Sequence, residues 1–170
     1  ETNDKEKKTR IIEIESIDTV LRLNNSTPKK FIKYEDFTND DVAVCQQIDD
    51  LISRNKNMFF ALVDKARWEG HLTEWVINNN YLSWDKNNKC FEMSLGNYKK
   101  KLSSPNVRQL LLNTGWFEYK VATMLKKWDK CKEIYVGVNF PAKNNTSKNE
   151  IDIIVNAGSR LIFVECKTKI

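Results

Sequence analysis

Two acidic residues and a lysine near the C-terminal end stand in apolar segments, where charged side chains are unusual. Asp152 lies among isoleucines and a valine, and the apolar run that begins at Leu161 continues into Glu165 and Lys167. Short apolar runs bounded by turn residues are typical of buried β-strands. A charge in such a strand is costly unless it is paired or bound to a metal ion. These three charged residues are therefore the first candidates for chemistry.

The segment between the two predicted strands fixes how they would pair. Residues 157–160 contain a glycine and small polar residues, which suit a hairpin turn. If they form a four-residue loop, Asn156 pairs with Leu161, and the same register puts Asp152 directly opposite Glu165. Opposed like charges are destabilising, so two carboxylates held this close require a cation between them. A slip of one residue would place them on opposite faces of the sheet.

Alternation along the second strand separates its polar side chains. Glu165 and Lys167 share one face, and Cys166 points to the other. We therefore expect Cys166 to be a core residue rather than a nucleophile.

A helix precedes these strands and contributes a third acid. Apolar residues recur at helical spacing after residue 113, namely Phe117, Val121, Met124, Leu125 and Trp128. Asn113 or Thr114 would cap its start, and lysines 126, 127 and 130 would lie at its C-terminal end, where cations are favoured. Glu118 lies on the shoulder of the apolar stripe, toward the sheet rather than open water. A strand at 133–139 and a polar loop at 141–148 would connect this helix to the strand pair.

Glu118, Asp152, Glu165 and Lys167 together form a candidate site of three acids and one amine. Hard oxygen ligands suit Mg²⁺ or Mn²⁺, which lower the pKa of bound water and stabilise charge developing on a phosphate. Lys167 would position or deprotonate the attacking water, or counter charge on the phosphate. The alternative is a surface cluster of salt bridges. Glu150 is expected to be an exposed residue at the start of its strand. The alternative is that it contacts the metal ligands without binding the metal itself.

The N-terminal half carries weaker signals. Residues 1–10 are expected to be poorly ordered, residues 10–23 alternate as a strand would, and residues 31–34 form a second short strand. Cap residues at 38–41 precede a helix over 42–54.

A longer helix is predicted over residues 57–80, followed by a hairpin over residues 81–93. This pattern suits a winged helix that binds nucleic acid, or a spacer that packs or forms dimers, and we favour the spacer. His71 and Trp116 are expected to be structural, and lysines 99–101 a solvated face rather than a phosphate contact.

Composition limits the class of protein. The chain has 170 residues, of which 41% are hydrophobic and 30% charged, which fits one ordinary globular domain or two small ones. We expect a cytoplasmic protein that does not contact a membrane, because no apolar run approaches a bilayer span and no signal peptide is visible. Four separated cysteines and one histidine argue against a zinc site, and the net charge of +5 mildly favours an anionic partner.

Three short segments resemble a known superfamily. Asp152, twelve intervening residues and then Glu165-Cys166-Lys167 resemble the motif of the PD-(D/E)xK nucleases, with Ile151 in place of the proline. Residues 115–118, 149–152 and 163–168 look like the nuclease half of CRISPR ancillary effectors, which join a CARF sensor domain to such a nuclease.

The resemblance implies a fold, a division of the chain and a function. The fold would be α/β, with a restriction-endonuclease-like core of one helix and a three-stranded mixed sheet, ending before the helix and strand that complete this core. Residues 1–56 would be a lead-in or the end of a sensor domain, residues 57–112 the spacer, and residues 113–170 the nuclease. The protein would be a homodimer that uses Mn²⁺ or Mg²⁺ to cut DNA, and in some members RNA, and that is activated by cyclic oligoadenylate.

Two other functions remain open. One is a nuclease of another branch of the superfamily, such as a restriction or repair enzyme. The other is a noncatalytic module that binds DNA through residues 57–101. A pure binding module gains nothing from three converging carboxylates beside a polyanion.

Overall fold

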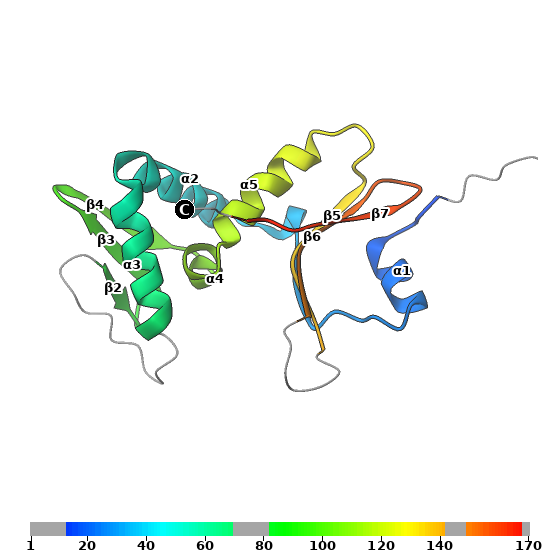
Figure 1. Cartoon of the computed structure of the whole chain (residues 1–170), viewed down its shortest axis with the longest axis horizontal. Helices are drawn as coiled ribbons and strands as arrows, with labels where there is room; N and C mark the ends of the chain where they lie inside the picture. Colours follow the sequence, from blue (N-terminus) through cyan, green and yellow to red (C-terminus); the bar gives the residue numbers. More distant parts are fainter. Residues whose placement is uncertain (1–12, 70–81, 142–148, 168–170) are drawn as a thin grey trace, which may run out of the picture.

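The computed structural model describes residues 13–69, 82–141 and 149–167 (Figure 1). In chain order its elements are α1 (Ile17–Leu23), β1 (Lys30–Lys33), the short 3-10 helix η1 (Tyr34–Asp36), α2 (Asn39–Arg54), α3 (Lys56–Glu69), β2 (Leu82–Asp85), β3 (Cys90–Leu95), β4 (Tyr98–Ser103), α4 (Val107–Leu112), α5 (Gly115–Lys126), β5 (Glu133–Phe140), β6 (Asn149–Asn156) and β7 (Leu161–Val164). No helix in these ranges is long and apolar enough to cross a membrane.

The strands form two sheets, one of four strands in the order β1-β5-β6-β7 and one of three in the order β2-β3-β4. Every described pairing is antiparallel. The predicted α/β class is compatible with this arrangement, but the prediction of a mixed sheet is wrong for these strands. The turn between β6 and β7 joins neighbouring strands directly, whereas parallel neighbours need a long crossover connection. The extra strand β1 pairs with β5 and comes from far earlier in the chain.

The four-stranded sheet is covered on both faces, by α1 on one and by α5 on the other (Figure 1). On the α1 face, Ile17 and Leu21 pack against Tyr135 and Ile154. On the α5 face, Ala122 packs among the buried residues Ile134, Val136, Ile153 and Val155. Because both faces are buried, these strands read as nearly continuous apolar runs.

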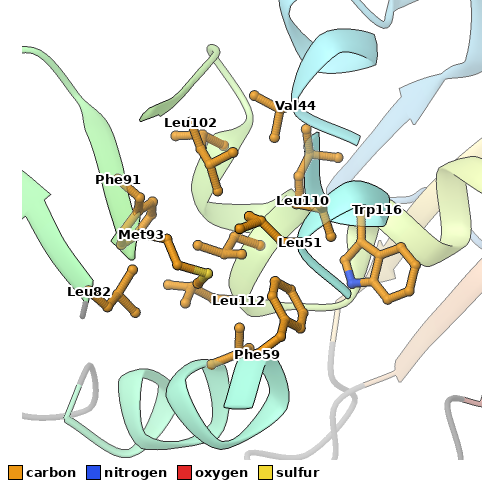
Figure 2. Close-up of a cluster of buried hydrophobic side chains, with 14 of the residues drawn as sticks. Val44, Leu51, Phe59, Leu82, Phe91, Met93, Leu102, Leu110, Leu112 and Trp116 are labelled. Atoms are coloured by element: carbon orange, nitrogen blue, oxygen red, sulfur yellow. The ribbon is translucent and has the colours of Figure 1, made fainter. Parts of the chain in front are cut away.

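The three-stranded sheet packs with α2, α3 and α4 around a separate core (Figure 2). Leu51, Phe59 and Met93 are fully buried there. Trp116 of α5 joins this same core, so α5 contacts both halves of the structure. Trp116 is therefore a packing residue, as predicted. The winged-helix likeness and the boundaries at residues 57 and 113 remain predictions.

Helix α2 has its cap in the predicted segment, at Thr38, and begins at Asn39, three residues before the predicted start. The Thr38 hydroxyl accepts a hydrogen bond from the Asp41 N–H at 3.1 Å, and the Asp41 carboxylate accepts one from the Thr38 N–H at 3.0 Å. This reciprocal capping box satisfies backbone donors that the first turn leaves unpaired. Asp41 also accepts a hydrogen bond at 3.0 Å from Nδ2 of Asn106, the residue that precedes α4.

The predicted strand over residues 10–23 is wrong wherever the structure describes it, because residues 13–16 form no strand and Ile17–Leu23 is the helix α1. Residues 10–12 lie outside the described residues. Ser16 caps this helix by accepting a hydrogen bond from the Thr19 N–H at 3.1 Å. Ile17 and Leu21 are also one helical turn apart and both buried, which is a helical rather than an alternating pattern.

The middle of the chain has more structure than predicted. The helix and the hairpin are present as α3 and β2–β3, but β4 and α4 were not foreseen. Lysines 99–101 lie in β4, where two are exposed and the third is half-buried. Residues 70–80 of the predicted helix, including His71, and residues 142–148 of the predicted loop lie outside the described residues.

In α5 the buried face differs from the predicted stripe. Glu118 and Ala122 are buried, whereas Met124 is 67% exposed and Trp128 is 38% exposed. The helix ends at Lys126, so Trp128 lies beyond it. The spacing of apolar residues alone could not show that α5 would pack against two surfaces, the four-stranded sheet and the other core.

The β6–β7 hairpin has the predicted register. Asn156 pairs with Leu161, and the N–H of Ala157 donates to the carbonyl of Arg160 at 2.9 Å. The buried Asn156 side chain holds the turn by accepting a hydrogen bond from the Gly158 N–H at 2.8 Å. Strand β7 ends at Val164, so Glu165 and Lys167 follow the strand instead of lying within it.

Candidate active site at the Gly137 break in the sheet

The alternation of side chains between the two faces of the sheet breaks in β5 at Gly137, which has a φ of +60°. Val136 packs on the α5 face, but Val138, two residues later, packs on the α1 face. The neighbouring strand does the same, because Ile153 packs on the α5 face and Ile151 on the α1 face. Regular strands place residues two apart on one face, so alternation is broken here. Asp152 lies at the break, opposite Gly137 in register.

Glu118 lies beside this break and is 5% exposed. Its Oε2 is 3.6 Å from the point where a Cβ on Gly137 would stand, so the missing side chain leaves room for the carboxylate. Among the described residues, the Glu118 carboxylate has neither a hydrogen-bond partner nor an ion-pair partner. Burial, together with the negative charges of Asp152 and Glu150, raises the pKa of Glu118 to about 8. The prediction that Glu118 faces the sheet is confirmed.

Asp152 is half-buried and is held by the chain that follows β7. Its Oδ2 accepts a hydrogen bond from the backbone N–H of Cys166 at 2.5 Å. Cys166 packs on the α5 face. Burial, and then Asp152 and Glu118, raise the pKa of its thiol to about 11. Such a thiol is a poor nucleophile at neutral pH, in line with the predicted core role.

Gln109 of α4 completes this cluster. Its Nε2 is 2.7 Å from the point where a Cβ on Gly137 would stand, so its amide group and the Glu118 carboxylate flank the same gap. Its Oε1 is buried and has no hydrogen-bond partner in the described part of the chain. A buried polar atom without a partner is costly, so this oxygen requires an explanation.

Glu165 and Lys167 are not brought to Glu118 and Asp152 in the structure. The Lys167 Nζ lies 3.1 Å from the Glu165 Oε1, and both side chains are more than 70% exposed. Within the described ranges, no three His, Cys, Asp or Glu side chains form a group that could hold a metal ion. The roles of Glu165 and Lys167 therefore stay predictions.

Glu150 is exposed at the start of β6, as predicted, and accepts a weak hydrogen bond at 3.4 Å from Asn139 Nδ2. It also borders a hollow of about 710 Å³ between α1 and the β6–β7 face, which Leu21, Phe140 and Phe163 help to line. This hollow opens on the α1 face of the sheet, on the other side from Glu118.

Gln109 and Gly137 were missed by reasoning from the sequence. Nothing in the local pattern around Gln109 marks it, because α4 itself was not predicted. Gly137 interrupts an otherwise apolar strand, and an isolated glycine in a strand is a known sign of a bulge or a close approach. That signal could have located the break before the structure was known.

The donor atoms at this break fit a hard divalent cation. The two carboxylates supply oxygen ligands, the type that Mg²⁺ and Mn²⁺ prefer, and the Gln109 side chain would add a third oxygen if its carbonyl rather than its nitrogen faced the gap. A buried carboxylate without a partner and a buried carbonyl oxygen without a partner are what such an ion would satisfy. Mg²⁺ is commonly held by one or two carboxylates and keeps several waters.

The C-terminal part of the chain is thus an α/β domain with two acids at the break in its sheet. Residues 106–170 match the family model described as "Card1-like, endonuclease domain". This match supports a nuclease of the CRISPR-associated kind, as the sequence motifs predicted. It starts at Asn106, so it includes Gln109 and α4 as well as the predicted site residues. No curated protein matches the chain.

Proposed function

We propose that this protein is a metal-dependent endonuclease that hydrolyses phosphodiester bonds in DNA, and also in RNA. The observation that carries this proposal is the pair of acids at the Gly137 break, Glu118 and Asp152, inside the segment that matches an endonuclease domain. A buried carboxylate with no partner among the described residues, beside a second carboxylate, is unfavourable for folding and useful for binding a cation.

Glu118 and Asp152 would hold Mn²⁺ or Mg²⁺, with Glu165 as the third acidic ligand. The bound ion would polarise the phosphate and lower the pKa of a water molecule. Asp152 is already oriented by the N–H of Cys166, which leaves its second oxygen for this role. Lys167, at the end of the same segment, would position the attacking water or counter the negative charge of the phosphate.

The broader assembly is also part of the proposal. The protein would act in the cytoplasm as a homodimer, and cyclic oligoadenylate bound by a sensor domain outside the assigned region would activate it. The motif likeness to CRISPR ancillary effectors and the match to the endonuclease domain support this proposal.

The test is cleavage of single-stranded DNA, supercoiled DNA and RNA by the full-length protein, with Mn²⁺ or excess EDTA, and with or without cyclic tetra-adenylate. Asp152→Ala should lower the cleavage rate about 100-fold or more, the scale for losing one stabiliser of transition-state charge. Asp129→Ala is the matched control, because Asp129 is an exposed acid outside the site.

Each other outcome selects another function. Cleavage that needs metal and Asp152 but no cyclic ligand indicates another branch of the nuclease superfamily. DNA binding without any cleavage indicates the noncatalytic module. Metal-dependent cleavage that survives Asp152→Ala contradicts the proposed site.

A further inference from the structure

We infer that Gln109 is part of the cation site, where its side-chain carbonyl oxygen supplies a neutral ligand beside Glu118 and Asp152. This inference rests on the proposed function, because it assigns a new residue to the same site. It is drawn from the contacts around Gly137 and from the unsatisfied oxygen of the Gln109 side chain.

The Gln109 amide group fits the break in β5 at Gly137. A side chain on Gly137 would approach Gln109 Nε2 to 2.7 Å, closer than such contacts normally occur, and would also touch Glu118 Oε2 at 3.6 Å. The glycine thus leaves space that the Gln109 amide occupies, with the Glu118 carboxylate bordering the same space. The amide nitrogen faces this space in the structure, and a half-turn of the amide group would bring its oxygen there instead. A glycine at a positive φ inside a strand is itself a departure from regular structure.

A tight backbone connection joins Gln109 to α5. The Gln109 carbonyl accepts a hydrogen bond from the Asn113 N–H at 3.1 Å. A Cβ on Gly115, the first residue of α5, would lie 2.9 Å from this carbonyl oxygen, so the two helices meet in direct backbone contact. Gln109 and Glu118 are therefore positioned by one rigid connection, which is what a preorganised ligand pair needs.

The Gln109 side-chain oxygen, Oε1, is buried and has no hydrogen-bond partner among the described residues. Glu118, whose Oε2 borders the same Gly137 position as the Gln109 amide, is only 5% exposed. Leaving a buried donor or acceptor unpaired costs free energy. One cation, or a water molecule bound to it, would satisfy both oxygen groups. An amide carbonyl adds a hard ligand without adding a further negative charge to a crowded acidic site.

The experiment is titration of the metal-free protein with Mn²⁺ alone, followed calorimetrically and by the electron paramagnetic resonance signal of free Mn²⁺. Gln109→Leu removes the amide at similar size, and Gln109→Glu keeps an oxygen ligand. Gln46→Leu is the matched control, because Gln46 is exposed on α2. Thermal unfolding in excess EDTA reports on the fold independently.

We expect Gln109→Leu to weaken Mn²⁺ binding about 10- to 100-fold, the range found when a group that supports a metal site is lost. Gln109→Glu should bind Mn²⁺ at least as tightly as the wild type, and Gln46→Leu should be unchanged. Gln109→Leu should not lower the melting temperature in EDTA, because it removes a buried oxygen that has no partner.

The inference is overturned if Gln109→Leu binds Mn²⁺ as the wild type does while Asp152→Ala does not bind it. In that case the proposed function stands and Gln109 is a packing residue. If the wild type itself binds no Mn²⁺, the proposed function fails, and the role of Gln109 fails with it.

Discussion

The Glu118 carboxylate of α5 lies beside Gly137 of the sheet, because Oε2 of Glu118 is 3.6 Å from the position that a Cβ on Gly137 would take. The acid can be buried at this place because the strand has no side chain there. Gly137 thus shapes the site without taking part in its chemistry.

Gly137→Ala should destabilise the fold and disturb the site together. An alanine at φ +60° costs about 1–2 kcal/mol, and its Cβ would also displace the Gln109 amide. Gly96→Ala is the matched control, since Gly96 has φ +61° but nothing within 4 Å of its Cβ position. Denaturant unfolding should show a larger loss for Gly137→Ala, and only this variant should lose Mn²⁺ affinity. Equal losses for both would mean that the gap at Gly137 is not shaped for the Gln109 amide.

Glu118→Gln should stabilise the metal-free protein at pH 8 and impair cleavage. The folded pKa of Glu118, about 8, lies above its ordinary value of 4.5 because the acid is buried, and Asp152 and Glu150 add to the effect. A raised carboxyl pKa gives stability that is complete at low pH and is lost as the pH rises toward 8. The melting temperatures of the wild type and Glu118→Gln, measured in excess EDTA between pH 5 and pH 8, should therefore differ most at pH 8 and become similar at pH 5. A wild type more stable than Glu118→Gln at pH 8 would contradict the assignment.

Asp41→Ala should cost about 1–3 kcal/mol at pH 7, because it removes the capping box and the link to Asn106. Burial opposes ionisation of Asp41, but hydrogen bonds from Asn106 and Thr38 outweigh it and hold the pKa of Asp41 below its ordinary value. The stability that its charge supplies is present above that ordinary value and is lost as the pH falls through the folded pKa. The difference in the free energy of unfolding between the wild type and Asp41→Ala should accordingly become smaller at acidic pH.

The control for this measurement is Asp40→Ala, which removes an exposed acid from the same first turn of α2. Its effect should stay below about 1 kcal/mol, the scale of an exposed charge near a helix N-terminus. Similar losses for the two variants would show that the buried hydrogen bonds of Asp41 contribute little.

Cys166 should react slowly with iodoacetamide at pH 8, because a pKa of about 11 leaves little thiolate. Asp152→Asn removes one charge that raises this pKa while keeping an acceptor for the Cys166 N–H, so alkylation of Cys166 should speed up. Cys131 serves as the internal control, since its pKa is raised mainly by burial and not by Asp152. Peptide mapping by mass spectrometry measures both sites in one sample. An unchanged ratio of the two rates would show that Asp152 does not act on the thiol.

Local sequence was sufficient for several elements. The capped start of α2, the β2–β3 hairpin and the pairing of Asn156 with Leu161 all follow from interactions within a few residues of each other. What depends on distant parts of the chain was mistaken or missed. The short strand β1 was predicted, but its pairing with β5, about a hundred residues later, was not. The helices α1 and α4 are too short for their own periodicity to be decisive.

The sequence by itself determined the motif, the acids it contains and the register of the hairpin that presents Asp152. Only the tertiary structure decided which acids meet. It brings Glu118 to Asp152 and adds Gln109, and it leaves Glu165 paired with Lys167 at the surface. The physical reason is the change of facing at Gly137, because a positive φ in one strand turns the neighbouring strand's Asp152 toward α5, and strict alternation could not predict that turn.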